Sequence, residues 1–341
     1  MIRLSASFAS VRLASIVSMV CLSLPAIQVA AQQQVSPSPA QEPSASTSAE
    51  PAIAPVFSKP DPANFTALAP TKEVVNAFLE ATWGYDESRV WLVQAILKTP
   101  VEGISKVVVL AGDKSGKKKI GQLQFFVLPD GKHILANGDI VAFGEHPYAE
   151  ERAILQQRAD GPYRGSAAKD LELIEFADLQ CPLCKEEQAN MDKLAADFPK
   201  ARIVFQNLSL EHIHLAAAKA AAYGVCVNKE GGSNAFFQFA STVFEGQAEL
   251  ATADGATLTL NSAVSKASLD PAKIAACAAT PETKTVVNAS VKLAKDLSIG
   301  QVPGQVPTLV INGRPVPMGG VPYETLKQIV AYQAKLDGVA D

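Results

Sequence analysis

The stretch Phe176–Lys185 reads FADLQCPLCK and holds two cysteines three positions apart. The run 171–176 before it predicts a short strand, and 182–197 after it predicts a helix. Pro182 suits the first helical turn because that turn needs no N–H donor, which places Cys181 at the N-cap. A strand, a loop and a helix therefore meet at a pair of thiols, and the function depends on what those thiols do.

The position of the two cysteines predicts different roles for them. The unpaired N–H groups and the positive dipole end of the helix favour a thiolate at Cys181. Cys184 lies one turn further into the helix and is expected to be less exposed. Disulfide exchange requires one thiolate that attacks and a neighbouring thiol that expels the product. The spacing therefore favours a redox pair.

A metal site and an inert structural bridge are the alternatives for these thiols. A zinc site would need two more ligands, and Glu211-His-Ile-His214 supplies the nearby candidates. A His-x-His pair points both rings the same way only on a strand, whereas this pair leads into an Ala-rich helix. A bridge between Cys181 and Cys184 would close a very small loop and would restrain the unfolded chain little.

The first residues resemble a targeting segment. Arg3 and Arg12 precede a largely apolar run over 13–27, and Val29-Ala-Ala31 fits the small-residue cleavage pattern. We expect 1–31 to be a cleavable signal peptide, which predicts a periplasmic or otherwise secreted protein. An uncleaved membrane anchor is the alternative, although the run is short for a bilayer span. The following segment, 32–63, is rich in Gln, Ser, Pro, Ala and Thr and is expected to be a disordered linker.

Composition limits the remaining possibilities. The chain has 341 residues, 48% hydrophobic and 19% charged, with a formal net charge of -4, which fits a globular protein with room for two domains. Neither a Lys/Arg block nor a basic face with interleaved aromatic residues is present, so nucleic acid is not an expected partner. Of the five cysteines, Cys21 lies in the signal segment. The other four are an even number, which is typical of two cysteine pairs in a protein exported to an oxidising compartment.

The pattern after the linker predicts a small α+β N-terminal domain over 64–160. Thr71 is a suitable cap for a helix that runs through Phe78 and Ala81. An antiparallel sheet is expected from β-rich segments, the last two joined at Pro129-Asp-Gly131. The segments are 104–110, 120–128 and 132–136; a further segment, 89–97, fits a helix and a strand equally well.

A second domain is predicted over 167–338, after a hinge or domain boundary at 161–166. Its pattern alternates between strands and helices. After the thiol-bearing helix, strands are expected at 203–206 and in a hairpin of 309–312 with 314–318. A mostly helical insertion is expected over 214–297, interrupted by a loop at 228–234. A closing helix is expected over 323–335.

Three features together resemble the thioredoxin superfamily and, within it, the DsbA/DsbC-type secreted thiol-disulfide oxidoreductases. They are LIEFADLQCPLC at 173–184, the helical insertion, and VPTLVING at 306–313. The resemblance covers about 170–338. It implies an α/β class, with a thioredoxin fold that carries the helical insertion and follows the small N-terminal domain.

The resemblance also implies roles for individual residues. Cys181 corresponds to the nucleophile and Cys184 to the resolving thiol. Pro307 corresponds to the cis-proline, and Val306 to the residue whose backbone pairs with an extended substrate. Glu175 resembles the buried acid that handles the proton of the inner thiol, and the alternative for it is a carboxylate at the sheet edge that faces solvent.

Two further points follow from the same resemblance. A second Val-Pro pair at 302–303 makes the loop longer than the family pattern, so the cis-proline is either Pro303 or Pro307. Adjacency to the strand favours Pro307. Related proteins often carry a second, structural disulfide in the helical insertion, which implies a Cys226–Cys277 bond.

The function implied is an exported enzyme, a protein thiol-disulfide oxidoreductase or isomerase. Its partners would be unfolded or misfolded exported proteins and a membrane redox partner, with no cofactor and no metal. FFVLPDGKHILANGDIV at 125–141 is similar to the N-terminal domain of DsbC- and DsbG-type isomerases, and permits a homodimer through that domain.

Two other classes of protein stay open at this stage. One is a thioredoxin-fold copper chaperone that binds through the CxxC and a histidine. The other is a binding module in which both disulfides are structural. The sequence also leaves open whether such an enzyme is an oxidase, an isomerase or a reductase.

Overall fold

The computed structural model describes residues 57–117, 119–300 and 304–339. The predicted signal peptide and most of the predicted linker lie outside these residues. The described strands form two five-stranded sheets that do not share a strand. None of the helices in the described ranges is both long enough and apolar enough to cross a membrane.

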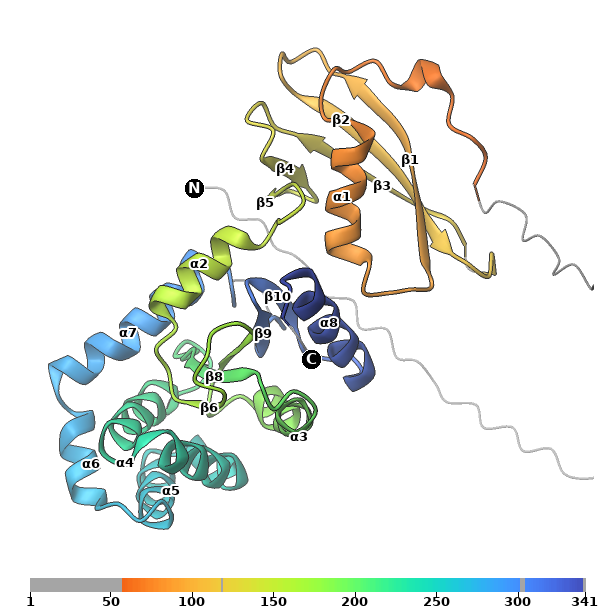
Figure 1. Ribbon diagram of the computed structural model, residues 1–341. Helices are drawn as coiled ribbons and strands as arrows, with labels where there is room; N and C mark the ends of the chain where they lie inside the picture. The colour runs from red at the N-terminus through yellow and green to blue at the C-terminus, as the bar shows by residue number, and fades with distance from the viewer. Residues whose placement is uncertain (1–56, 118, 301–303, 340–341) are drawn as a thin grey trace, which may run out of the picture. The chain divides into compact units, whose positions relative to one another are not determined.

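The first sheet is an antiparallel meander with strand order β1-β2-β3-β4-β5. Helix α1 (Lys72–Trp83) lies along one of its faces (Figure 1). The side chain of Thr71 caps this helix by accepting a hydrogen bond from the Val74 N–H, as predicted. The strands are β1 (Arg89–Lys98), β2 (Ser105–Asp113), β3 (Gly121–Val127), β4 (His133–Ala136) and β5 (Asp139–Ala142). The ambiguous segment 89–97 is therefore a strand.

Two elements of this part were not predicted. Strand β5 pairs with β4 through Asn137 and Gly138, which both have positive φ. An Asn-Gly pair is a strong local signal for such a hairpin. Helix α2 (Ala149–Arg158) buries only Leu155, so it has no apolar stripe by which the sequence could reveal it.

The second sheet has strand order β10-β9-β7-β8-β6. Strands β7 and β8 are parallel and are connected through helix α3, whereas the other neighbours are antiparallel. Every residue of β7 is buried, because elements cover both faces of this central strand. The elements are β6 (Tyr163–Gly165), β7 (Glu172–Ala177), α3 (Pro182–Asp197), β8 (Arg202–Asn207), β9 (Thr308–Ile311), β10 (Arg314–Pro317) and α8 (Tyr323–Leu336). This is the thioredoxin-type α/β fold that the sequence predicts.

The segment 161–166, predicted as a hinge or domain boundary, includes strand β6 and is therefore not a free hinge. Tyr163 pairs with Val204 and Gly165 with Arg202, so the segment closes one edge of the second sheet. Gly165 has a φ of 84°, and a Cβ at this position would collide with the Ala201 carbonyl oxygen. The glycine that suggested a hinge therefore allows a close approach of two backbones.

The insertion between β8 and β9 is helical, as predicted. Figure 1 shows its helices gathered together, and α5, α6 and α7 all contact α4. A disulfide between Cys226 and Cys277 joins α4 to α6. The helices are α4 (Ala217–Glu245), α5 (Ala253–Lys266), α6 (Pro271–Ala278) and α7 (Pro281–Asp296), with a short 3-10 turn, η2 (Gln247–Ala251).

The predicted loop at 228–234 is wrong, because α4 passes through it with one kink. Gly232 has a φ of 74° and a ψ of -177°, which is outside the helical region. Beyond the kink, Phe236 and Phe239 are buried against the same core as the first half of the helix. This packing keeps the polar, glycine-containing segment within a helix.

Candidate active site

The candidate site lies where β7 ends and α3 begins. Pro182 is the first residue of α3, and Cys181 is its N-cap. The Cys181 N–H donates to the Asp178 carbonyl at 3.0 Å, which closes the turn between the strand and the helix. The sequence prediction of a thiol at a helix N-terminus is therefore confirmed at Cys181.

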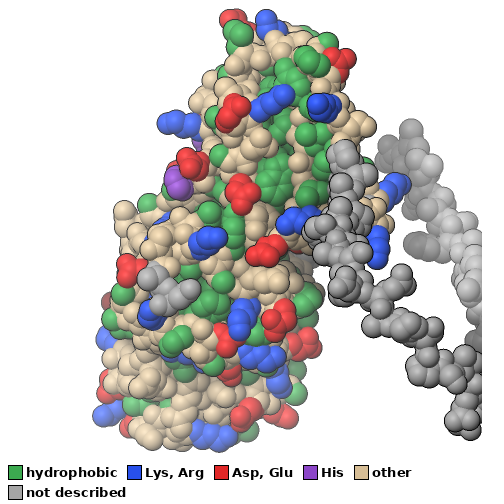
Figure 2. Space-filling view, turned by 45° about the vertical axis from the view of Figure 1, so that its right-hand side comes forward, with side chains coloured by type: hydrophobic (Ala, Val, Ile, Leu, Met, Phe, Trp, Pro, Cys, Tyr) green, Lys and Arg blue, Asp and Glu red, His purple; other side chains and the backbone are tan. Residues whose placement is uncertain are grey.

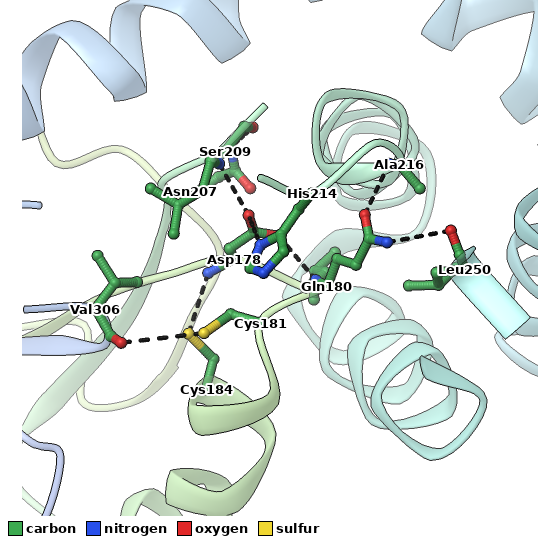
Figure 3. Close-up of polar contacts among 12 residues, drawn as sticks. Asp178, Gln180, Cys181, Cys184, Asn207, Ser209, His214, Ala216, Leu250 and Val306 are labelled. Carbon is green, nitrogen blue, oxygen red and sulfur yellow. Dashed lines mark hydrogen bonds and ion pairs between the residues drawn. The ribbon is translucent and has the colours of Figure 1, made fainter. Parts of the chain in front are cut away.

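The two sulfur atoms have unequal surroundings. Figure 3 shows them close together at the start of α3, with Val306 on one side and His214 on the other. Both thiols are free, and Cys184 is 0% exposed whereas Cys181 is 6% exposed. The Cys181 thiol donates to the Val306 carbonyl at 4.0 Å, and Cys184 Sγ accepts from the Asp178 N–H at 3.4 Å. Cys181 is the outer thiol and Cys184 the inner one.

The acidities of the thiols differ in the same sense. The hydrogen bond from the Cys184 thiol is the main cause that lowers the pKa of Cys181 to about 6. The backbone N–H groups of Cys184 and Leu183 and the charge of His214 also lower it, and burial acts in the opposite direction. Burial, followed by the bond to Cys181, raises the pKa of Cys184. The outer thiol is thus the one that ionises near neutral pH.

Pro307 lies beside the thiols at the start of β9. Its bond to Val306 is cis, and the Val306 carbonyl faces Cys181. The alternative proline, Pro303, lies outside the described residues. The cis Val306–Pro307 bond and the outer thiol therefore lie side by side.

Glu175 is buried in β7, at the centre of the second sheet. Its side chain accepts a hydrogen bond from Gln188 Nε2 at 2.8 Å, and the same amide donates to the Cys184 carbonyl at 3.0 Å. Burial raises the pKa of Glu175 to about 7. The alternative of a solvent-facing carboxylate is therefore wrong, because β7 has a neighbouring strand on each side and the residue is 3% exposed.

Asp178 is a site residue that the sequence analysis did not identify. Its buried carboxylate accepts hydrogen bonds from the backbone N–H groups of Gln180, at 2.8 Å, and Leu210, at 2.9 Å. The same carboxylate lies 2.9 Å from His214 Nδ1. The signal was present as an acid three residues before Cys181, but its partners follow 32 and 36 positions later.

Two glutamines also hold the loop that carries Cys181. Gln247 Nε2 donates to the carbonyls of Leu179 and Cys181, both at 3.0 Å. Gln180 Nε2 donates to the Leu250 carbonyl at 3.1 Å, and its Oε1 accepts from the Ala216 N–H at 2.7 Å. The helical insertion is thereby bound to the backbone of the site.

The two histidines considered as metal ligands face different surroundings. His212 is exposed, and Nδ1 of His214 is directed at Asp178. Within 57–117, 119–300 and 304–339, no group of three or more His, Cys, Asp and Glu side chains is arranged to hold a metal ion. The copper-chaperone hypothesis has no supporting cluster in this part of the chain.

Comparison with protein families gives one extended match. A family model described as thioredoxin matches residues 157–331, which is more than half of the chain. A stretch of 91 residues is 29% identical to the Na(+)/H(+) antiporter NhaA 3 of Salinispora tropica. That stretch is 27% of this chain and 14% of the antiporter, so most of the antiporter has no counterpart here.

Several solved structures are similar to about half of this chain. ScsC of Proteus mirabilis, in a transitional conformation, is 22% identical, with 55% of this chain and 78% of that chain covered at a TM-score of 0.45. Oxidised BdbD of Bacillus subtilis is 19% identical, with 51% and 93% covered at 0.45. DsbA2 of Pseudomonas aeruginosa is 26% identical, with 51% and 93% covered at 0.41.

Proposed function

The chain belongs to the thioredoxin family, and from this premise we propose that it is an exported enzyme that forms or rearranges disulfides in other exported proteins. One observation carries the proposal: an acidic outer thiol, Cys181, at a helix N-terminus, backed by a buried inner thiol, Cys184. This is the asymmetry that thiol-disulfide exchange requires.

The oxidation of a substrate dithiol proceeds in two exchanges. A substrate thiolate attacks the Cys181 sulfur of the Cys181–Cys184 disulfide; that bond breaks, a mixed disulfide forms, and Cys184 leaves and takes up a proton. The second substrate thiolate then attacks the substrate sulfur of the mixed disulfide and expels Cys181. Two electrons pass from the substrate to the enzyme. Cys181 is a good leaving group because its pKa is low.

Glu175 is the group proposed to exchange the proton of Cys184. A carboxyl with a pKa of about 7 can give and take a proton at neutral pH, and its negative charge is among the causes that raise the pKa of Cys184. Gln188 bridges the Glu175 carboxyl and the Cys184 carbonyl, and so fixes the acid relative to the inner thiol.

The surroundings of Cys181 suit an unfolded polypeptide as substrate. Leu183 and Ile213 are exposed, and Leu215 is 87% exposed. The segment that carries Ile213 and Leu215 is bound to the loop before Cys181 through Ala216 and Gln180. Apolar side chains beside a reactive thiol favour binding of apolar segments, which folded proteins bury. The backbone of Val306 is the proposed partner of an extended chain.

Two parts of the proposal concern the setting of the enzyme. The signal-like N-terminus supports export to the periplasm or beyond. A repeated cycle of oxidation needs a partner that reoxidises the Cys181–Cys184 pair, and we assign this to a membrane redox protein. Reduction by such a partner would serve isomerisation instead.

A homodimer through the first sheet is the last part of the proposal. Phe126, Leu135 and Ile140 are neighbours across β3, β4 and β5, and all three are exposed. Figure 2 shows hydrophobic side chains on the surface of the part that holds this sheet. Exposed apolar patches of this kind are typical of interaction surfaces.

The test compares two assays on the same protein. We expect the enzyme to oxidise reduced ribonuclease or to reactivate scrambled ribonuclease, and Cys181→Ser to lose both activities. The ratio of the two activities distinguishes an oxidase from an isomerase. His212→Gln, at an exposed residue of the neighbouring loop, is the control and should keep both activities. Full activity of Cys181→Ser would overturn the proposal.

A further inference from the structure

His214 is a titratable group at the site, and the exchange steps proposed above assign it no role. It lies after β8, just before α4, and reaches the loop between β7 and α3 (Figure 3). Its Nδ1 lies 2.9 Å from Asp178 Oδ2, and its side chain is 15% exposed. A half-buried imidazole bound to a carboxylate is held in one orientation.

The Asp178 carboxylate is held in place by the surrounding backbone. Its side chain is 1% exposed, yet both oxygens accept backbone N–H groups, one from Gln180 and one from Leu210. Hydrogen bonds of this kind stabilise a buried carboxylate. In the Asp178–His214 pair, the carboxylate is therefore the inner, buried group and the imidazole is the outer group.

The residues between the two cysteines carry no charge of their own. Pro182 and Leu183 contribute a helix start and an apolar side chain, so the positive field at Cys181 comes from the helix end and from elsewhere in the fold. The charge of His214 acts on Cys181 and favours its ionised form. Asp178 faces the imidazole from the loop before α3, and Glu211 and His212 are exposed on its own segment.

We propose that His214, oriented by Asp178, is a positioning residue that stabilises the Cys181 thiolate and thereby makes the enzyme a stronger oxidant. The charge of His214 stabilises only the reduced enzyme, because the Cys181–Cys184 disulfide carries no charge. When two substrate thiols reduce that disulfide, one proton stays on Cys184, one goes to solvent, and Cys181 is left as the thiolate beside the imidazolium. A stabilised product shifts the equilibrium toward substrate oxidation. The consequence for oxidation rests on the proposed function; the electrostatic coupling does not.

The first experiment measures the coupling in variants. In His214→Gln we expect the Cys181 pKa, followed by thiolate absorbance, to rise by about one unit, and the equilibrium constant with glutathione to shift about tenfold toward the disulfide. His212→Gln replaces an exposed imidazole two residues away and should change neither quantity more than about twofold, because water and salt screen exposed charges. Equal results for the two variants would overturn the proposal.

The second experiment needs no variant and so does not depend on how a variant folds. Coupling between two sites is reciprocal, so reduction of the enzyme must favour the charged imidazole as much as that charge favours the thiolate. We expect the NMR titration of the His214 ring to have its midpoint at higher pH in the reduced than in the oxidised enzyme. Identical titrations in the two states would rule out the coupling. Neither experiment requires a catalytic assay, so this inference and the proposed function can fail separately.

Discussion

At the scale of the residue, the candidate site depends on a difference between two identical side chains. Cys181 lies at the N-cap of α3 and meets N–H donors, whereas Cys184 lies one turn later and is fully enclosed. The first environment favours a thiolate and the second a thiol. The same element therefore supplies an attacking and a resolving sulfur.

This difference predicts the behaviour of a single substitution. Cys184→Ser keeps a hydroxyl donor beside Cys181 but loses the group that expels the product, so a mixed disulfide with substrate should accumulate. Non-reducing gels or mass spectrometry of protein isolated with its substrates would detect it. Cys181→Ser is the matched variant and should form none. Adducts through Cys184 in that variant would contradict the assignment.

Glu175 predicts a dependence of stability on pH. Its pKa of about 7 in the folded protein exceeds the ordinary value of 4.5, so the stability associated with its proton is complete below about pH 4.5 and is lost as pH rises through 7. Glu175→Gln should therefore stabilise the fold at pH 8, by up to about 3 kcal/mol, and leave it nearly unchanged at pH 4.5. Urea unfolding of both proteins across this range is the measurement, and a pH-independent difference would contradict the prediction.

At the scale of the element, the helical insertion does more than enlarge the domain. Gln247, which follows α4, donates to the carbonyls of Leu179 and Cys181, and Gln180 binds the insertion in return. The insertion also delivers His214 to Asp178 and carries the exposed Leu215. A loop between a strand and a helix is thereby fixed by a segment far from it in the sequence.

The glutamine contacts predict the effect of loosening this loop. Gln247→Ala removes two hydrogen bonds to the loop carbonyls and should lower the free energy of unfolding by about 1–2 kcal/mol. It should also slow thiol exchange, because Cys181 is held less firmly against Val306. Chemical unfolding and the rate of reaction with a small disulfide would measure both effects. Gln238→Ala, at an exposed residue of α4, is the control and should change neither.

At the scale of the whole molecule, the redox state and the stability of the fold are linked. The Cys181 thiol has an ordinary pKa of 9.0 and a pKa of about 6 in the folded protein. Folding therefore favours the thiolate, and the stability that this adds is complete above pH 9 and is lost as pH falls through 6. The disulfide form has no thiolate, so its stability does not include this contribution.

The reduced protein should consequently gain stability over the oxidised protein as pH rises. From pH 6 to pH 8 we expect the difference in unfolding free energy to move by about 2 kcal/mol in favour of the reduced form. Thermal unfolding of both forms at several pH values would test this. Parallel curves would mean that the Cys181 thiolate has no special stabilisation in the fold.

The sequence by itself determined the local part of this protein. FADLQCPLCK placed Cys181 at a helix start because proline and unpaired N–H groups act within one turn, and Asn312-Gly313 fixed the β9–β10 hairpin for a similar local reason. At α2, β6 and the kink of α4 the local signals were weak or misread, and packing between distant segments determined the secondary structure. Only the tertiary structure brought His214 to Asp178 and Gln247 to the loop that carries Cys181. Hydrogen bonds between residues that are 36 or 66 positions apart produce no periodic pattern in the sequence. They form only after the folded core has brought their donor and acceptor atoms together.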